Sequence, residues 1–407
     1  MCPSDLSRKE FNEKFNQFCQ KWDVPRYVLL TEFDNRLLLD LKNPLHVNEI
    51  YTIVKKENSR VIKLAEMTCD FDKYAVTDKN GHRYITEIVV PFVLSNNNVK
   101  SNKKHEYILT DSDIEKNALQ VTTGERILVP GQDDWFYFKL YGYSKRKNEL
   151  IAYLYDKLEN LIATHKAKQY FFIRYSDPEQ HLRIRVRAEE NMKFLAFDEL
   201  MHLFEQFRNA ALISKVVVDT YERETVRYGG AKLIKDAEKY FFYDSQTVMK
   251  IIYMQQLKKE KFNLEYIGVS FITMAMEAFR LSLKDREELL SSISNQSLYR
   301  KEFQQERKTL IDAVNHTNQW QEIRSKVDYP YVYDYLTELF IPLKQYADAV
   351  YQANQEGIIT NTIEDIMKSI IHMFCNRLVG NNAWERKIYA LTRHATHSLK
   401  GMMEHKK

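Results

Sequence analysis

The sequence predicts an α+β fold in which a mixed sheet bears a charged pocket, helices back the sheet, and the C-terminal half is largely helical. Two patterns predict it. In residues 169–187, two aromatic and β-branched runs flank a proline-containing break, which is typical of two strands joined by a turn. Beyond residue 245, apolar residues recur at helical spacing in segments 247–258, 267–283, 297–316, 333–354 and 363–379.

The first part of the chain predicts a helix followed by strands. Ser7 and Glu10 have the spacing of a capping box, and four aromatic residues follow at helical spacing: Phe11, Phe15, Phe18 and Trp22. We expect strands at residues 24–31 and 36–41, and a hairpin at residues 74–85 around Asn80. Residues 95–104 are polar and basic without apolar periodicity, which indicates a loop.

A new apolar pattern starts near residue 129, and we place a boundary there between two domains, residues 1–128 and 129–407. Residues 147–161 and 194–209 have apolar side chains at helical spacing on either side of the central strands. Residues 244 and 245, Asp and Ser, are suited to cap a helix that starts at residue 246. This alternation of strands and helices favours a sheet packed against helices.

The composition excludes several classes of protein. With 10 Gly in 407 residues, the chain contains no glycine-rich phosphate loop, and its net charge of +4 does not indicate binding to nucleic acid or membranes. The 4 Cys are isolated, so no zinc finger is expected and a reducing cytoplasm is the simplest location. No signal sequence and no apolar run of about 18 residues is present, so we expect a soluble protein.

The second strand of the central pair, residues 181–186, carries a row of cations. Alternation places Leu182, Ile184 and Val186 on one face, and the other face holds His181, Arg183, Arg185 and Arg187. Unpaired guanidinium groups need water, acidic partners or an anionic ligand. The row is therefore either a solvated or internally paired face, or part of an anion pocket. A second charge-rich stretch, residues 216–230, supplies groups that suit a shared pocket: Glu222, Arg223, Glu224 and Arg227.

Five sequence blocks in order carry a resemblance to a known family. They are WFYFKLY at residues 135–141, FFIRY with HLRIR at 171–185, TYERETVRYGG at 220–230, FYDS at 242–245 and HMFCNRLVG at 372–380. Together they resemble the elimination domain of LanB-type lantibiotic dehydratases, also called the thiopeptide-type bacteriocin biosynthesis domain. Residues 24–46 resemble the closing portion of the large glutamylation domain that precedes elimination in this family.

The resemblance implies a lyase. In the family, a glutamylation domain uses glutamyl-tRNA as co-substrate to modify Ser and Thr of a precursor peptide, and the elimination domain expels the glutamate to leave dehydroalanine or dehydrobutyrine. Almost all of the glutamylation domain is absent from these 407 residues. We therefore expect the elimination half of a split or truncated dehydratase, with no cofactor and no metal.

The resemblance also implies partners and a location. The expected partners are a precursor peptide with its leader, a separate glutamylation subunit, a lanthionine cyclase, a transporter and a second copy of the chain. Direct contact with nucleic acid is not expected. We expect a cytoplasmic protein, and peripheral association with a membrane-bound export machinery stays open.

The matching blocks assign roles to eight residues of this sequence. The expected catalytic residues are His372, Arg183, Arg185, Arg227 and Glu224, and the expected substrate-binding residues are Arg174, Arg187 and Arg377. Loss of an α-proton builds negative charge on the substrate, and departing glutamate is an anion, so preorganised arginines suit the reaction. A histidine titrates near neutrality and suits proton transfer. Whether Glu224 is the base or only orients Arg227 stays open.

Three other functions stay open at this level. Related thiopeptide proteins catalyse a formal 4+2 cycloaddition between two dehydroalanines, but they typically lack the glutamylation segment and diverge in the arginine and histidine set. A non-catalytic module that binds precursor peptide is the second alternative. An RNA-binding protein is the third, and it has little support because its basic residues are few and dispersed in a predicted loop: Lys100, Lys103 and Lys104.

Overall fold

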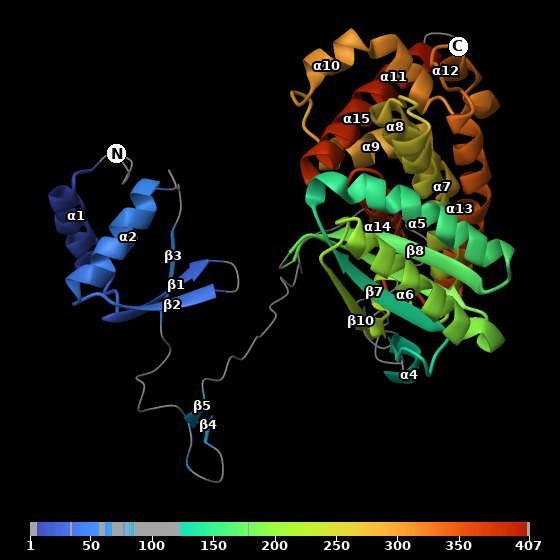
Figure 1. Ribbon diagram of the computed structural model, residues 1–407. Coiled ribbons are helices and arrows are strands. Elements are labelled where there is room, and N and C mark those ends of the chain that lie inside the picture. Colours follow the sequence, from blue (N-terminus) through green and yellow to red (C-terminus); the bar gives the residue numbers. More distant parts are fainter. Residues whose placement is uncertain are drawn as a thin grey trace. The chain divides into compact units, whose positions relative to one another are not determined.

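The computed structural model describes residues 6–32, 35–56, 62–66, 76–77, 81, 83–84, 123–177 and 179–404. The chain divides into two units, residues 1–102 and 103–407, which we describe separately (Figure 1). The predicted basic loop at residues 95–104 and the predicted turn residue Asn80 lie outside the described residues. No helix in the described parts of the chain has the length and apolar character needed to cross a membrane.

The first unit packs two helices against a small antiparallel sheet of order β2-β1-β3. Its elements are α1 (Arg8–Lys21), β1 (Tyr27–Glu32), β2 (Asn35–Asp40), α2 (Pro44–Lys56) and β3 (Lys63–Glu66). The predicted capping box is present, because the Ser7 side chain accepts from the Glu10 amide and Glu10 accepts from Ser7. The predicted first hairpin is confirmed, whereas α2 was not predicted. Two short paired strands follow, β4 (Val76–Thr77) and β5 (Arg83–Tyr84).

The second unit is built on a four-stranded sheet of order β10-β7-β9-β8, in which every neighbouring pair is antiparallel. Its strands are β7 (Trp135–Tyr141), β8 (Ala167–Tyr175), β9 (His181–Ala188) and β10 (Lys215–Asp219). Two shorter strands, β6 (Ile127–Leu128) and β11 (Tyr221–Glu222), pair beside it, after α4 (Thr123–Arg126). The α+β class and the central strand pair are confirmed. Since β6 pairs with β11, residues 127–128 pack with this unit, and the functional boundary at residue 128 stays a prediction.

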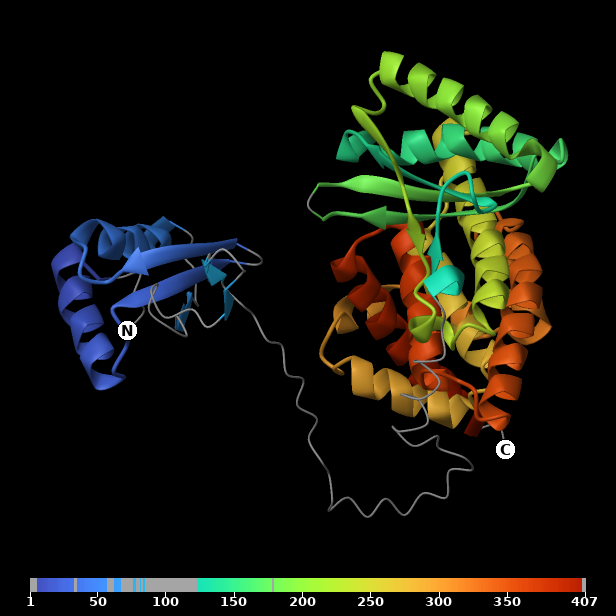
Figure 2. The same cartoon turned by 90° about the horizontal axis from the view of Figure 1, so that it is seen from below.

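The two faces of this sheet meet different partners. On one face, Phe136 and Phe138 of β7 contact Phe197 of α6 (Lys193–Asn209), with ring centroids 5.0 and 5.7 Å apart. Helix α5 (Lys147–Ala163) buries its leucines beside β8 and, with α6, forms one layer (Figure 2). The other face carries the predicted cation row. Tyr137 lies between Phe136 and Phe138 and so points to this face, and its partner in the register is Arg185, which also lies opposite Phe171 in β8.

The C-terminal half is helical, as predicted, but its divisions differ from the expected segments. The helices are α7 (Ile234–Leu257), α8 (Leu264–Ala278), α9 (Leu283–Ile293), α10 (Arg300–Gln305), α11 (Arg307–Val314), α12 (Gln321–Arg324), α13 (Val332–Gln355), α14 (Ile363–Leu378) and α15 (Asn382–Glu404). The predicted helix start at residue 246 is wrong, because Asp244 and Ser245 lie fully buried inside α7. Their side chains bond to other segments instead of capping a helix.

Hydrogen bonds from side chains of α7 and α14 occupy main-chain groups at the free edge of β8. The Phe172 amide donates to Ser245 Oγ at 3.2 Å, and the Phe172 carbonyl accepts from Arg377 Nε at 2.9 Å. Two residues along, the Asn376 side chain accepts from the Arg174 amide and donates to the Arg174 carbonyl, both at 2.9 Å. An edge strand with unpaired main-chain groups is a site for unwanted pairing, and side chains of α7 and α14 remove that exposure here. This sealed edge fixes α14 against the sheet.

Gly380 ends α14 and allows Arg174 to approach closely. It has φ +72°, and a Cβ atom built there would lie 2.5 Å from Arg174 Cδ. We expect Gly380→Ala to lower the free energy of unfolding by about 1–3 kcal/mol, since a left-handed alanine costs about 1–2 kcal/mol before the clash is added. Chemical denaturation measures the change. The matched control is Gly401→Ala, where a Cβ meets nothing within 4 Å and helix propensity favours alanine. Equal changes in the free energy of unfolding of the two variants would show that the close approach of Arg174 to Gly380 does not contribute to stability.

Candidate functional site

A cavity of about 120 Å³ lies between the cation-bearing sheet face and α14. The cavity lies in the second unit, and segments far apart in the sequence contribute to it. Six of the eight predicted site residues line this cavity: Arg174, Arg185, Glu224, Arg227, His372 and Arg377. Arg183 and Arg187 do not line it. The structure therefore joins the cation row and the second charge-rich stretch in one place, at Arg185 and Arg227.

Arg185 is a buried cation in a cage of aromatic rings. Its side chain is 7% exposed, and its guanidinium carbon lies 4.4, 4.7 and 5.2 Å from the ring centroids of Tyr137, Tyr221 and Phe171. Its Nε is buried without a hydrogen-bond partner, and no described carboxylate pairs with it. Cation–π contacts offset part of the cost of burial but leave the Nε–H group of Arg185 unsatisfied. An anionic ligand would satisfy this donor.

Glu224 and Arg227 lie on a loop that the surrounding helices hold in place. Arg227 donates from Nη1 to Glu224 Oε2 at 3.0 Å and from Nε to Ser369 Oγ of α14 at 3.2 Å. Both side chains are partly exposed, at 36% and 55% for Arg227 and Glu224. The loop closes with Gly229 and Gly230, which have φ +93° and +111°. The ion pair between Arg227 and Glu224 is partly solvated, and the strength of such a pair is modest.

The base of this loop rests on a buried ion pair. Arg223 donates to Glu238 of α7 from Nε at 2.6 Å and from Nη2 at 2.8 Å, and Glu238 is 1% exposed. Tyr221 donates its hydroxyl to the same carboxylate at 3.0 Å. Burial, and then the charge of Glu238, raises the pKa of Tyr221 well above its ordinary value, although Arg185 and Arg223 act in the opposite direction. The Tyr221 phenol therefore stays neutral beside Arg185.

His372 faces the cavity from α14 and is held by a carboxylate. Its Nδ1 lies 2.9 Å from Oε2 of Glu385, in the first turn of α15, and Glu385 is 15% exposed. The His372 side chain is 41% exposed, so solvent or substrate can reach it. A carboxylate on Nδ1 fixes the ring orientation and favours a proton on that nitrogen, which leaves Nε2 for chemistry. Among the described residues, Nε2 has no hydrogen-bond partner.

Arg174 and Arg377 line the cavity, but their guanidinium groups donate hydrogen bonds to other residues of the protein. Arg174 donates to the carbonyls of Arg377 and Leu378 at the end of α14, and to Asn148. Burial lowers the pKa of Arg174 to about 10, so it stays charged and interacts favourably with the helix terminus. Arg377 is 1% exposed and pairs with Asp244. Their contacts fix α14 against β8, and the predicted substrate-binding role stays a prediction.

Arg183 and Arg187 lie on the same sheet face as Arg185 but point to other partners. Arg183 stacks over Tyr175 at 3.3 Å and donates from Nε to His181 Nε2 at 3.1 Å. Burial lowers the pKa of His181, which fits an imidazole that accepts this bond. Arg187 forms an ion pair with Asp134 at 2.7 Å. Of the three arginines in the row, only Arg185 enters the cavity, and the predicted roles of the other two stay predictions.

The structure adds residues that the sequence patterns did not single out. Glu385 lies 13 positions after His372, on a helix that was not predicted, so no spacing rule links the two. Ser369 lies one turn before His372 on α14, and that i, i+3 spacing was a signal that could have placed it on the same side. Tyr137 and Tyr221 belong to the sequence blocks that carry the family resemblance. Their contacts with Arg185 could not be predicted, because they depend on how distant strands pair and pack.

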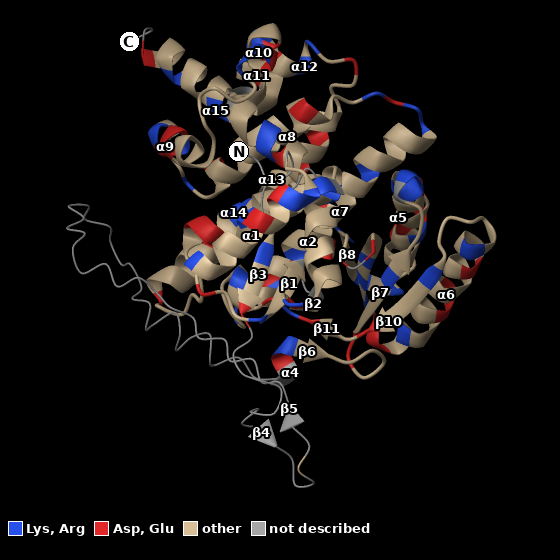
Figure 3. Ribbon diagram, turned by 90° about the vertical axis from the view of Figure 1, so that its left-hand side faces the viewer, with Lys and Arg blue, Asp and Glu red and all other residues tan. Residues whose placement is uncertain are grey.

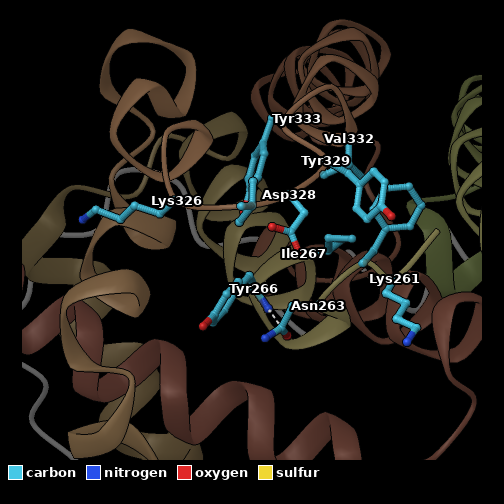
Figure 4. Close-up of a pocket in the computed structure, with 11 residues that line it drawn as sticks. Lys261, Asn263, Tyr266, Ile267, Lys326, Asp328, Tyr329, Val332 and Tyr333 are labelled. Carbon is cyan, nitrogen blue, oxygen red and sulfur yellow. Dashed lines mark hydrogen bonds between the residues drawn. The ribbon is translucent and has the colours of Figure 1, made fainter.

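A separate cavity of about 220 Å³ lies in the helical half (Figure 4). Its lining includes Tyr266, Tyr329 and Tyr333, together with Lys261 and Lys326. Lys326 pairs with Asp312, and none of the predicted site residues lines this cavity. The cavity between the sheet and α14 is therefore the candidate site.

The arrangement supplies an anion pocket and a proton-transfer pair. Arg185 and Arg227 offer guanidinium groups that bind carboxylates in a bidentate manner. His372 with Glu385 offers an oriented imidazole, and Glu224 offers a second carboxylate. Such a set is able to remove a proton and stabilise the charge that develops, which suits an elimination.

Comparison with known proteins identifies the family. The family described as lantibiotic biosynthesis dehydratase C-term matches residues 135–396, and lantibiotic dehydratase, N terminus, matches residues 3–50. Subtilin biosynthesis protein SpaB of Bacillus subtilis is 30% identical over 399 residues, which cover 97% of this chain and 37% of SpaB. Nisin biosynthesis protein NisB of Lactococcus lactis subsp. lactis is 23% identical over 389 residues, which cover 94% of this chain and 36% of NisB. The chain thus spans less than two fifths of the length of these relatives.

A solved structure shares the fold. The tRNA-dependent lantibiotic dehydratase MibB from Microbispora sp. 107891 matches with a TM-score of 0.58 and 18% identity, over 100% of this chain and 39% of MibB. The predicted resemblance is confirmed by the family match over residues 135–396, which contains every predicted site residue. The chain belongs to the lantibiotic dehydratase family.

Proposed function

We propose that the second unit eliminates glutamate from glutamylated Ser or Thr of a ribosomally made precursor peptide, giving dehydroalanine or dehydrobutyrine. The family match supports an enzyme that acts in dehydration of precursor peptides in lantibiotic biosynthesis. The finer assignment to glutamate elimination rests on one observation above all. Arg185 is a buried guanidinium without a described acidic partner, at the wall of a cavity that also contains Arg227 and His372.

The residues divide the reaction between binding and proton transfer. Arg185 and Arg227 hold the glutamyl carboxylate and the charge that builds as the α-proton leaves. His372, oriented by Glu385, passes a proton to the departing glutamate. Glu224 is released from Arg227 when the substrate anion takes its place, and this frees a carboxylate near the scissile bond. The α-proton acceptor is Glu224 in this scheme.

Glutamylation is assigned to protein outside these 407 residues. The chain corresponds to 37% of SpaB and 36% of NisB, and its first unit matches only residues 3–50 to the N-terminal family. In the proposal, glutamyl-tRNA serves that other part, and elimination itself uses no cofactor or metal. The precursor peptide is the direct partner, and a cyclase and a transporter follow in the same pathway.

The purified chain should release glutamate from a peptide that is already glutamylated, and it should leave the unmodified peptide unchanged. The reason is that the cavity holds groups for anion binding and proton transfer, whereas no part of the proposal supplies an activated glutamate. Mass spectrometry distinguishes the outcomes by loss of the glutamyl mass and gain of a dehydrated residue.

The control adds glutamyl-tRNA and unmodified peptide to the same chain. Dehydration under those conditions would contradict the division of labour between this chain and the glutamylating part. Failure to release glutamate from the glutamylated peptide would contradict the elimination assignment itself.

A further inference from the structure

The two edge strands of the four-stranded sheet, β8 and β10, differ in what occupies their outer main-chain amide and carbonyl groups. Side chains of α7 and α14 occupy the main-chain groups of β8, at one edge. At the other edge, β10 pairs with β7 on one side, and within the described residues no strand pairs with its outer side. One row of amide and carbonyl groups of Lys215–Asp219 therefore faces outward. Proteins usually cover such an edge, so an open one is suited to receive an extended chain.

A cavity of about 420 Å³ lies beside the start of this edge, and its apolar lining is interrupted by polar side chains, namely His202, Glu205, Arg208, Ser214 and Lys215. Met201 and Phe204 of α6 form one wall, and Ile213 and Val216 form the other. Figure 3 shows β10 and α6 next to each other, in agreement with this lining. Val218 is 41% exposed and lies opposite Phe138, on the sheet face that α6 covers. A strand added to β10 would place every second side chain on the face that α6 covers, next to Val218 and, at the start of β10, next to this cavity.

The opposite face of the same edge carries two charged residues. Lys215 and Asp219 flank Val217 on this face, Asp219 pairs with Lys139 of β7, and Val216 and Val218 lie on the other face, where Val218 is exposed and Val216 is half-buried. Lys215 lies 5.0 Å from the Tyr141 ring. The added strand would therefore meet apolar groups on one face and charged groups on the other. A peptide with alternating apolar and polar residues matches both faces.

Strand β10 leads directly to the candidate site. Asp219 lies opposite Tyr137, and two residues later the Tyr221 ring is 4.7 Å from the Arg185 guanidinium. Glu222, Glu224 and Arg227 then line the site cavity. A strand added outside β10 would lie three strand positions from β9, which carries Arg185. At a spacing of about 4.8 Å this is roughly 14 Å, a distance that about four to five extended residues span.

We propose that an extended segment of the precursor peptide, flanking the modified Ser or Thr, binds as a fifth strand on β10 with alternate apolar side chains in the α6 cavity. The choice of occupant rests on the proposed function. The surface would hold the peptide by main-chain hydrogen bonds, which accept many sequences. The apolar side chains on this face, Met201, Phe204, Val216 and Val218, would supply a preference for aliphatic or aromatic residues at alternate positions.

Hydrogen exchange of the full chain tests this binding without requiring catalysis. Addition of a glutamylated precursor peptide should slow amide exchange in residues 215–219, and Val218→Glu should remove that protection. Val218→Glu should also weaken peptide binding about tenfold by fluorescence anisotropy, because a charge would enter the apolar contact. The control is Ile341→Glu, which places the same charge at a residue 61% exposed on α13 and should leave binding unchanged.

A kinetic comparison separates this inference from the proposed function. A short glutamylated tripeptide does not reach β10, so Val218→Glu should raise KM about tenfold for the long peptide alone, with kcat unchanged for both. If the wild-type chain releases no glutamate, the elimination assignment is contradicted. The amide exchange of residues 215–219 with bound peptide still tests the docking site in that case. Unchanged exchange in residues 215–219, or equal affinity of Val218→Glu and wild type, overturns the docking proposal.

Discussion

Replacing Arg185 by alanine should reduce glutamate release from a glutamylated peptide by about 10²–10³-fold, the range seen when a preorganised group that stabilises developing charge is removed. The protein should stay folded, since Arg185 pairs with no described carboxylate and its removal leaves no buried anion uncompensated. Arg185→Lys should restore only part of the rate, because an ammonium does not reproduce the guanidinium fork. Single-turnover kinetics with detection of released glutamate measures the change.

Arg187→Ala is the matched control for this prediction. Arg187 lies two residues along the same strand and on the same face, but it pairs with Asp134 outside the cavity. Its loss should change glutamate release by less than about threefold, in line with the small energy of a partly exposed ion pair. Equal losses in both variants would mean that the whole cation row acts through stability or long-range charge. Unfolding of Arg185→Ala in circular dichroism would make Arg185 structural.

Replacing His372 by alanine should slow elimination by about 10²–10⁴-fold, the usual contribution of a positioned acid or base. Binding of the glutamylated peptide should stay near the wild-type level, because the arginines supply most of the anion affinity. A better leaving group, which needs no protonation, should restore much of the rate. If the variant is equally slow with both substrates, His372 does not protonate the leaving group.

Two controls separate the chemistry of His372 from its packing. His397→Ala removes another histidine that pairs with a glutamate, Glu287, but at the surface and away from the cavity, so elimination should be unaffected. The double variant His372→Ala, Glu385→Ala should be no slower than His372→Ala alone if Glu385 acts only by positioning the imidazole. A further loss in the double variant would give Glu385 an independent role.

Local patterns predicted the strand that carries the site. The two-residue period of β9 placed Arg183, Arg185 and Arg187 on one face, and the register confirms that arrangement. The same period placed Arg174 on the opposite face, where it lies across from Leu182. These predictions succeeded because side-chain direction in a strand depends only on the backbone.

The distinction between the three arginines was not predictable in the same way. Arg187 meets Asp134, which is 53 positions away, and Arg183 meets its own neighbour His181, whereas Arg185 meets only rings. Each outcome depends on packing between distant segments. The helix that contains Asp244 and Ser245 shows the same effect. Both residue types favour helix caps. Here they lie inside α7, where the Asp244 carboxylate pairs with Arg377, 133 positions away, and the Ser245 hydroxyl accepts a hydrogen bond from the edge of β8.

The most direct test of the central claim is a crystal structure with a peptide whose glutamyl ester is replaced by a non-eliminating amide. Arg185 should then make hydrogen bonds of about 2.7–2.9 Å to a glutamyl carboxylate, the usual length for charge-assisted bonds. Arg227 should have exchanged Glu224 for the same ligand, and His372 Nε2 should lie next to the amide group that replaces the ester. A glutamyl group bound elsewhere, with Arg185 still enclosed by its aromatic rings and without an anionic partner, would contradict the account.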